Sequence, residues 1–212
     1  AMGMHANQSG PVEIDAVIGG SAIDTLVGIT DDNVWQVTGT NAGTVTTTRT
    51  GTTVQISSVS FTGFENLAGN MNADAFRFAD GGSVAGFVDG AVGTNTLDYQ
   101  FRTAAVTVNL GAASAGETTA VGGGIRNITA VVGTSQVDTL LGPDVDATWN
   151  ITEANAGTID RVRFDTSGVP YLAAVSFTGF ENLTGADDAD DGFIIRASSP
   201  SRIRSTPARS RS

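Results

Sequence analysis

The second half of this chain repeats the first, and this repeat limits the possible folds more than any other feature. Trp35 recurs as Trp149, and after two inserted residues the sequence of residues 59–67 returns unchanged at 175–183. The period is about 115 residues, and repetition on this scale is typical of arrays in which each unit packs on its neighbours. A residue present in both copies is therefore explained more simply by the architecture than by a unique active site.

The composition favours an all-β protein. Short runs of Val, Ile, Thr and Phe fill most of the 212 residues, and Gly, Asn or Asp separates almost every pair of runs. Turn signals at intervals of about 8–12 residues are typical of sandwiches, barrels and solenoids. In the first copy we expect strands at residues 13–18, 25–27, 34–38, 44–48, 54–61, 76–78, 83–88, 96–101 and 106–110. No apolar run is long enough to span a bilayer.

The long period and the many apolar triplets flanked by Gly favour a parallel β-solenoid of the β-helix or β-roll type. In such a fold each coil presents short strands to the coils above and below it. The fold would consist of one full and one partial repeat of about 115 residues. The chain then divides into residues 1–11 (cloning remnant and N-terminal segment), 12–124 (first repeat unit), 125–195 (partial second unit) and 196–212 (Ser/Arg-rich basic tail).

Residue types that are missing exclude several kinds of active site. There is no Cys and a single histidine, His5, which excludes thiol catalysis, Cys-ligated zinc and a His-rich zinc site. The formal net charge is −11, and the basic residues concentrate at and beyond Arg196. An acidic body does not suit nucleic acid, whose phosphates need a basic face. It suits a soluble extracellular protein or one that meets divalent cations.

Two interpretations of the tail remain open. Residues 196–212 contain no acidic residue and no β pattern, and the repeat predicts a different sequence there. The tail is either a basic arm for anionic partners or translation beyond a cloned fragment in the wrong frame. Because an array cut inside a unit leaves unpaired strand edges, we expect a homodimer formed through the open solenoid end or through the tail.

Five segments share a Gly-rich turn followed by Asp or Asn and an apolar residue. They lie at residues 19–28, 69–76, 90–99, 133–142 and 185–193. These segments resemble degenerate copies of the G-G-x-G-x-D-x-U-x nonapeptide of haemolysin-type calcium-binding β-roll proteins. Together with the Phe-Thr-Gly-Phe-Glu-Asn-Leu sequence, they resemble the repeat regions of large bacterial secreted and surface proteins of the adhesin type. The resemblance implies a stalk or passenger segment that is secreted or displayed on the cell surface.

The same resemblance raises the question of bound Ca²⁺. Ca²⁺ takes about six to eight oxygen ligands, which the nonapeptide supplies only in tandem stacks. Because the motifs here are isolated, we expect no tight Ca²⁺ site at Asp24 or Asp138, where the carboxylates would cap their own turns. The candidate metal ligands are Asp187, Asp188, Asp190 and Asp191. The alternative for this run is an ordinary solvated acidic loop.

Two pairs of repeated residues suggest a functional site, but a structural role explains each pair more simply. Glu65 and Glu181 suggest the paired carboxylates of a glycosidase, but the repeat places them several coils apart. Hydrogen bonding to backbone groups beside their own turns is the simpler role. Trp35 and Trp149 could stack on sugars, whereas their repetition favours packing in the core.

The leading function is therefore structural: a repeat segment of a secreted or cell-surface bacterial protein, with Ca²⁺ as the candidate cofactor and carbohydrate as a candidate partner. The alternative is a hydrolase built on the solenoid, either a glycosidase or a divalent-metal-dependent phosphoesterase. Such an enzyme would work with Asp or Glu, because Cys and Lys are missing and His5 lies in an unpatterned terminal segment. The sequence singles out no catalytic residue.

Overall fold

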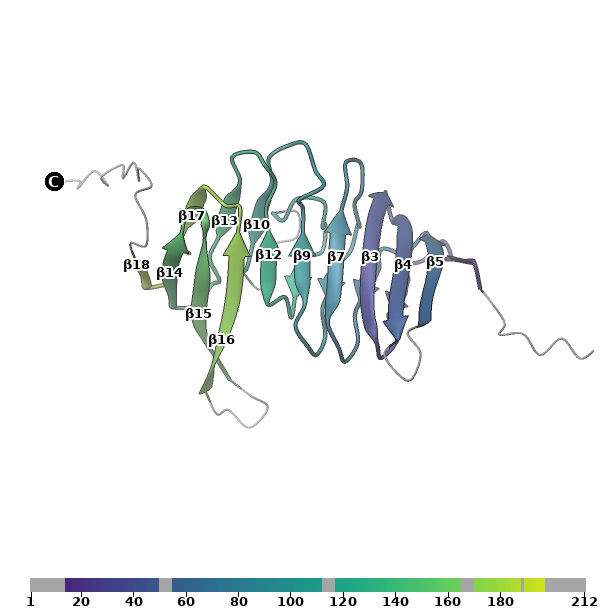
Figure 1. Cartoon of the computed structure of the whole chain (residues 1–212), viewed down its shortest axis with the longest axis horizontal. Helices are drawn as coiled ribbons and strands as arrows, with labels where there is room; N and C mark the ends of the chain where they lie inside the picture. The colour runs from purple at the N-terminus through teal and green to yellow at the C-terminus, as the bar shows by residue number, and fades with distance from the viewer. Residues whose placement is uncertain (1–13, 50–54, 112–116, 165–169, 188, 197–212) are drawn as a thin grey trace, which may run out of the picture.

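The computed structural model describes residues 14–49, 55–111, 117–164, 170–187 and 189–196. These residues form 18 β-strands, and among them there is no helix. The strands lie side by side along one elongated body, and the chain advances from one end of the body to the other (Figure 1). The expectation of an all-β protein is confirmed, and most strand pairs are parallel. Within the described ranges nothing forms a helix that is long and apolar enough to cross a membrane.

The strands are short, and most contain three to nine residues. Those of the first copy are β1 (Ala16–Ile18), β2 (Thr25–Val27), β3 (Asp32–Gly39), β4 (Ala42–Arg49), β5 (Gln55–Thr62), β6 (Asn66–Ala68), β7 (Asp74–Phe78), β8 (Val88–Asp89), β9 (Thr96–Asp98) and β10 (Thr107–Asn109). Those that follow are β11 (Ile125–Arg126), β12 (Ala130–Val132), β13 (Thr139–Leu141), β14 (Ala147–Glu153), β15 (Ala156–Phe164), β16 (Pro170–Thr178), β17 (Asn182–Thr184) and β18 (Asp191–Ile195).

The two copies have the same strand order in the main sheet of 11 strands. The order is β1-β5-β4-β3-β7 in the first copy and β12-β16-β15-β14-β18 in the second, with β9 between β7 and β12. β1 pairs parallel with β5, with Val17 opposite Phe61, and β12 pairs parallel with β16, with Val131 opposite Phe177. The repeat in sequence is thus a repeat in backbone pairing, and the second copy continues the sheet that the first begins.

Each copy contains one antiparallel meander. It consists of β3, β4 and β5 in the first copy and of β14, β15 and β16 in the second. The turn between the first two strands needs a left-handed backbone, with φ of 53° at Asn41 and 58° at Asn155. Asn tolerates this conformation better than other residues that carry a side chain. The repeated Asn therefore forms the same left-handed turn in both meanders.

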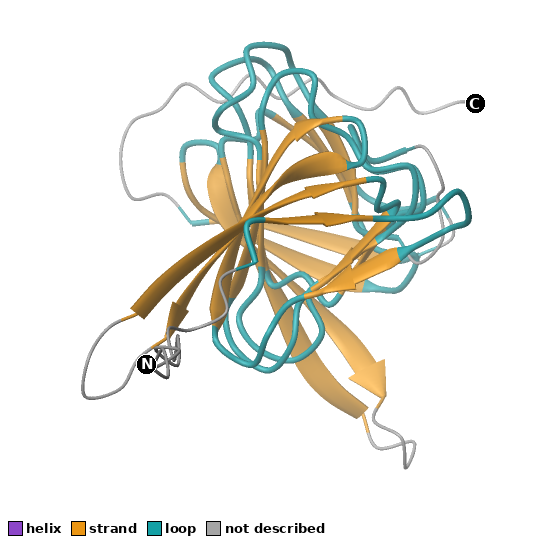
Figure 2. Ribbon diagram, turned by 90° about the vertical axis from the view of Figure 1, so that its right-hand side faces the viewer, coloured by secondary structure: helices purple, strands orange, loops and turns teal. Residues whose placement is uncertain are grey.

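Two smaller sheets lie opposite the main one. Their strand orders are β11-β8-β6-β2 and β10-β13-β17, and all of their pairings are parallel. Along most of the chain, one strand of a small sheet alternates with one strand or meander of the main sheet. The view along the body shows the strands fanning past one another, with loops at the edges (Figure 2).

Aromatic side chains fill the interior between these sheets. Trp35 stacks on Phe76 with ring centroids 5.6 Å apart and meets Phe61 edge-on at 6.0 Å. In the second copy Trp149 meets Phe177 edge-on at 6.1 Å. Because successive side chains of a strand point to opposite faces, buried residues alternate with partly exposed ones along β3 and β7. The alternation directs the aromatic residues into one continuous core.

The structure differs from the expected strands at two places. The sequence does not predict β6 or its counterpart β17, which are three residues long and form by pairing with β2 and β13. The strand expected at residues 83–88 is reduced to β8, preceded by isolated bridges at Ser83 and Val84. Gly86 lies so close to the segment around β6 that an added Cβ would fall 1.9 Å from Oδ1 of Asn66. At this close contact the chain forms no continuous strand over residues 83–88.

Several expectations about organisation remain predictions. They are the division into segments 1–11, 12–124, 125–195 and 196–212 and the homodimer. Residues 1–13, which include His5, and residues 197–212 lie outside the described part of the chain.

Candidate functional site

The repeated aspartates hold their own turns. In four of the five motifs a backbone N–H four or five residues earlier donates to the carboxylate: Gly20 to Asp24, Asn70 to Asp74 at 3.0 Å, Thr134 to Asp138, and Ala186 to Asp191 at 2.8 Å. A carboxylate that accepts such an amide closes the turn in place of a backbone carbonyl. Turn closure therefore engages one carboxylate oxygen of each of these aspartates.

The second oxygen of two of these carboxylates accepts a hydrogen bond from a neighbouring coil. Oδ1 of Asp138 accepts the backbone N–H of Val106 at 2.8 Å. Oδ1 of Asp74 accepts the side-chain amide of Asn33 at 2.7 Å. Asp74 and Asp138 are buried, and both oxygens of each are engaged by N–H donors. These donors fix the orientation of both carboxylates inside the protein.

Asp74 also belongs to a polar ladder that runs along the core. Its backbone N–H donates to Oδ1 of Asn95 at 3.1 Å, and the Asn95 amide donates to the Asn127 carbonyl at 3.1 Å. Burial raises the pKa of Asp74 above its ordinary value, and hydrogen bonds from the Asn33 side chain and the Asn70 amide oppose that rise. The ladder thus satisfies polar groups that would otherwise be unpaired inside the stack.

Glu65 and Glu181 have the same local role in their respective copies. One oxygen of Glu65 accepts the Asp24 backbone N–H at 2.9 Å, and the other accepts the Asn41 amide at 2.9 Å. Glu181 accepts the Asp138 backbone N–H at 2.8 Å and the Asn155 amide at 2.6 Å. Each glutamate therefore links the left-handed Asn of its meander to the Asp turn of the same copy.

The two repeated tryptophans also have a structural role. Trp35 and Trp149 are fully buried and so present no surface to a sugar.

The acidic run near the end of the second copy is divided among different contacts. Asp191 closes the turn at Ala186, and the backbone N–H of Asp190 donates to Asp146 at 3.0 Å. Asp188 lies outside the described residues. Within the described ranges no three acidic, histidine or cysteine side chains group as a metal site would require. The metal ligation proposed for this run stays a prediction.

The structure also corrects the alignment of the last motif. Asp191, and not Asp190, occupies the position of Asp74. Asp74 pairs in register with Asn33, and Asp191 pairs in the same register with Ala147, the counterpart of Asn33. The sequence between Ala186 and Asp191 contains one more residue than the first copy, so counting from the start of the motif selects the wrong Asp.

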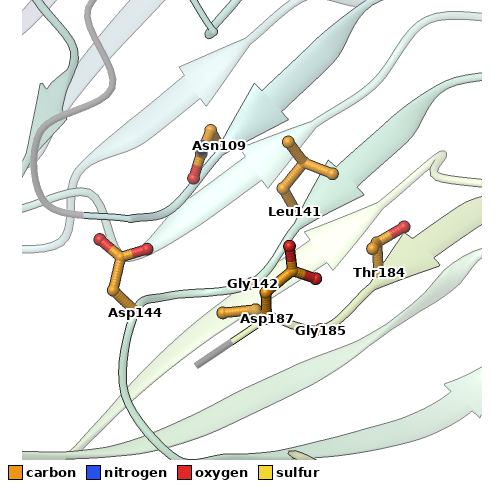
Figure 3. Close-up of a pocket in the computed structure, with 8 residues that line it drawn as sticks. Asn109, Leu141, Gly142, Asp144, Thr184, Gly185 and Asp187 are labelled. Carbon is orange, nitrogen blue, oxygen red and sulfur yellow. The ribbon is translucent and has the colours of Figure 1, made fainter. Parts of the chain in front are cut away.

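A depression lined mainly by the second copy contains two carboxylates, those of Asp144 and Asp187. It has a volume of about 340 Å³. Its lining residues are Asn109, Leu141, Gly142, Asp144, Thr184, Gly185, Ala186 and Asp187. Asp144 comes from the loop after β13 and Asp187 from the loop after β17, and Figure 3 shows the two beside Gly142. The fold thus brings together two acidic loops that are far apart in the sequence.

The two carboxylates of this depression are not imposed by the repeat. In the first copy the corresponding residues are Thr30 and Met71. The Asp144 carboxylate lies against Gly111, where an added Cβ would fall 2.6 Å from its Oδ1. Sequence reasoning selected Asp187 but missed Asp144, although its departure from the repeat was the signal that could have identified it. Two carboxylates with amide and hydroxyl neighbours are suited to holding a hydrated divalent cation or to polarising a water.

Comparison with known proteins adds no relationship to these observations. No protein-family model, no curated protein and no solved structure matches this chain.

Proposed function

We propose that this chain is a structural segment of a secreted or cell-surface protein and that it folds as a parallel β-solenoid. One observation carries the proposal: the polar residues that recur in both copies are used to hold the array together. Glu65 and Glu181 accept the backbone N–H groups of Asp24 and Asp138, which lie about 40 residues earlier in the chain. Asp24 closes its own turn, and Asp138 also accepts the Val106 N–H. The polar residues that recur in both copies therefore serve the fold.

The pairing pattern supports the solenoid part of this proposal. The chain moves between the main sheet and the small sheets, and it returns beside the strand that it formed one coil earlier. Thr25 lies opposite Asn66 on one face, and Asn33 lies opposite Asp74 on the other. An array of this kind is extended by adding coils at its ends, without rearranging its interior. An acidic, cysteine-free and elongated body suits a stalk or passenger segment outside the cell.

A chain in which residues 14–127 occur twice in tandem tests the structural role. If the unit stacks as proposed, the maximum dimension from small-angle X-ray scattering should increase by about the length of one unit, while the cross-section stays the same. The free energy of unfolding should not decrease. A longer chain that scatters as a compact or branched particle would contradict the solenoid.

A second candidate function rests on the depression that contains Asp144 and Asp187. Because these carboxylates depart from the repeat, they are the residues to test for weak divalent-cation binding or for hydrolysis of a glycoside or phosphoester. The test is a panel of chromogenic glycosides and phosphoesters, each measured with added Ca²⁺ or Mg²⁺ and with EDTA. Activity that disappears in both Asp144→Asn and Asp187→Asn but survives in Asp160→Asn would establish the hydrolase.

The structural proposal expects no turnover in this panel. Asp160 serves as the matched control because its carboxylate accepts the Asn150 amide at 2.9 Å within a strand pair and does not line the depression. Loss of activity in all three variants would indicate a general effect on folding, which the melting temperature of each variant identifies.

A further inference from the structure

The first coil of the array exposes a face that the second copy buries. We name this the first-coil face and define it by Ile14, β1 and β2. Ile14 is 57% exposed and Ile18 is 80% exposed. The counterpart of Ile14 in the second copy, Ile128, is only 4% exposed, and the counterpart of Ile18, Val132, is partly buried. The same repeat position is thus open in one copy and covered in the other.

In the second copy this face is covered by β9 and β10, which belong to the same chain. β9 pairs parallel with β12, with Leu97 opposite Val131. β10 pairs parallel with β13, with Val108 opposite Leu140. In the first copy β1 is the last strand of the main sheet and β2 the last strand of its small sheet, so among the described residues no strand occupies the places of β9 and β10.

The backbone edge of β1 matches the edge that β9 uses. The Ala130 N–H donates to the Asn95 carbonyl at 3.0 Å, and the Tyr99 N–H donates to the Val132 carbonyl at 2.9 Å. The corresponding groups in β1 are the N–H of Ala16 and the carbonyl of Ile18. In a parallel strand, alternate residues direct their backbone groups to opposite neighbours. The Asp15 carbonyl accepts the Ser60 N–H and the Gly19 N–H donates to the Thr62 carbonyl, so residues 15, 17 and 19 face β5. The backbone groups of residues 16 and 18 therefore face outward.

Two side chains extend the match beyond the backbone. In the second copy Thr129 accepts the Asn95 N–H through its hydroxyl at 2.8 Å, and Asp138 accepts the Val106 N–H through Oδ1. The first copy has Asp15 and Asp24 at these positions, and one oxygen of Asp24 already closes its own turn. Both residues can accept an N–H from an incoming strand as their counterparts do.

We propose that the first-coil face is a docking site for a pair of β-strands of the β9–β10 type, supplied by another unit of the same repeat. The incoming strands would lie parallel to β1 and β2, with a Leu97-like side chain against Val17 and a Val108-like side chain against Leu26. The site adds strands in the way that exposed sheet edges commonly do, but its specificity comes from the register of the repeat. This inference deepens the structural role proposed above and depends on it.

The test uses the full chain and a fluorescently labelled peptide that carries residues 94–111. Binding is followed by fluorescence anisotropy, and we expect it to saturate. Ala16→Pro should weaken binding at least about tenfold, because it removes the N–H that the Asn95 carbonyl needs while leaving the β5 side of β1 intact. A peptide with Leu97→Asp should bind equally weakly, because Leu97 is fully buried in its own chain.

A crosslink tests the register. The chain contains no cysteine, so a disulfide between Val17→Cys in the chain and Leu97→Cys in the peptide can form only where we introduce the thiols. Residues that lie opposite each other on adjacent strands are about 5 Å apart, within the span of a disulfide. Val92→Cys is the control, because Val92 is 66% exposed but lies away from the first-coil face. We expect crosslinking at Val17→Cys and not at Val92→Cys.

Three results would overturn the proposal. The first is no saturable binding and no selective crosslink. The second is binding that appears only after residues 1–13 are removed, because the chain's own N-terminal segment would then be the occupant. The third is a dimer, seen by light scattering, that excess peptide does not dissociate, because a second copy of the whole chain would then cover the face. The tandem-repeat scattering experiment reports on the structural role independently of all three results.

Discussion

The Asn33 side-chain amide donates a 2.7 Å hydrogen bond to the Asp74 carboxylate, and the second copy has no counterpart of this bond. Ala147 lies opposite Asp191 in the register in which Asn33 lies opposite Asp74. Oδ1 of Asp191 is buried and has no hydrogen-bond partner among the described residues. The copies therefore share a backbone path while differing in how completely their polar interior is satisfied.

The Asn33–Asp74 bond should contribute measurably to stability. Asn33→Ala should lower the free energy of unfolding by about 2–3 kcal/mol, because it leaves a buried carboxylate oxygen without its donor. Chemical denaturation measures the change. In the Asp74→Asn background the same substitution should cost less, since no charge is left unpaired. Equal costs in the two backgrounds would show that the amide stabilises the fold independently of the Asp74 charge.

The contribution of Asp74 to stability should depend on pH. Because burial raises its pKa in the folded state, the folded protein binds this proton more tightly than the unfolded chain does. The contribution is fully present below the unfolded pKa, about 3.9, and is lost as the pH rises through the folded pKa.

Comparison with a variant isolates this pH effect from the other acidic groups. The difference in unfolding free energy between the wild type and Asp74→Asn should shift in favour of the variant as the pH rises from about 3.5 towards neutrality. Denaturant titrations at a series of pH values measure this difference. A difference that is constant, or that moves in favour of the wild type, would contradict the burial of this carboxylate.

Substitutions of Glu65 and Glu181 should lower the free energy of unfolding by similar amounts. Glu65→Gln and Glu181→Gln each replace one accepting oxygen with an NH₂ group, so one of the two hydrogen bonds must be lost. We expect each variant to lose about 1 kcal/mol of unfolding free energy, because the bonds are only partly buried. Thermal unfolding of the two single variants checks the prediction. A much larger effect of one than of the other would show that the two copies use this residue differently.

Removal of the turn carboxylates should affect stability without any link to calcium. Asp138→Ala should cost about 2–3 kcal/mol, because it leaves the buried N–H of Val106 and the partly buried N–H of Thr134 unpaired. Asp24→Ala should cost less, since Asp24 is only partly buried. For the wild type and for each of the two variants, the melting temperature in Ca²⁺ should equal that in EDTA. Tight, stoichiometric Ca²⁺ binding by calorimetry that both variants lose would refute this prediction.

Short-range pattern in the sequence was sufficient for part of the fold. The alternation in β3 and β7, the Asn at each meander turn and the Asp at each Gly-rich turn act within a few residues of themselves. Their physical effects, the directions of side chains and the closure of turns, are local and can therefore be recognised from the sequence. The equal strand order of the two copies agrees with the recurrence of these patterns.

Other elements depended on partners that are distant along the chain. β6 has little strand signal of its own, and it forms because β2 and β8 lie on either side of it. Likewise, nothing local distinguishes Asp191 from Asp190. The register with Ala147 makes the choice, since a shift of one residue would turn every side chain of β18 to the other face.

The sequence by itself determined that this chain is an all-β array of one repeated unit, because repetition, turn residues and apolar alternation are properties of neighbouring residues. Only the tertiary structure decided which carboxylates meet. Asp144 and Asp187 share a depression because β13 and β17 pair in register and carry their following loops to the same place. It also decided that Ile18 is exposed while Val132 is partly covered, because burial depends on whether a neighbouring coil is present and not on the residue itself.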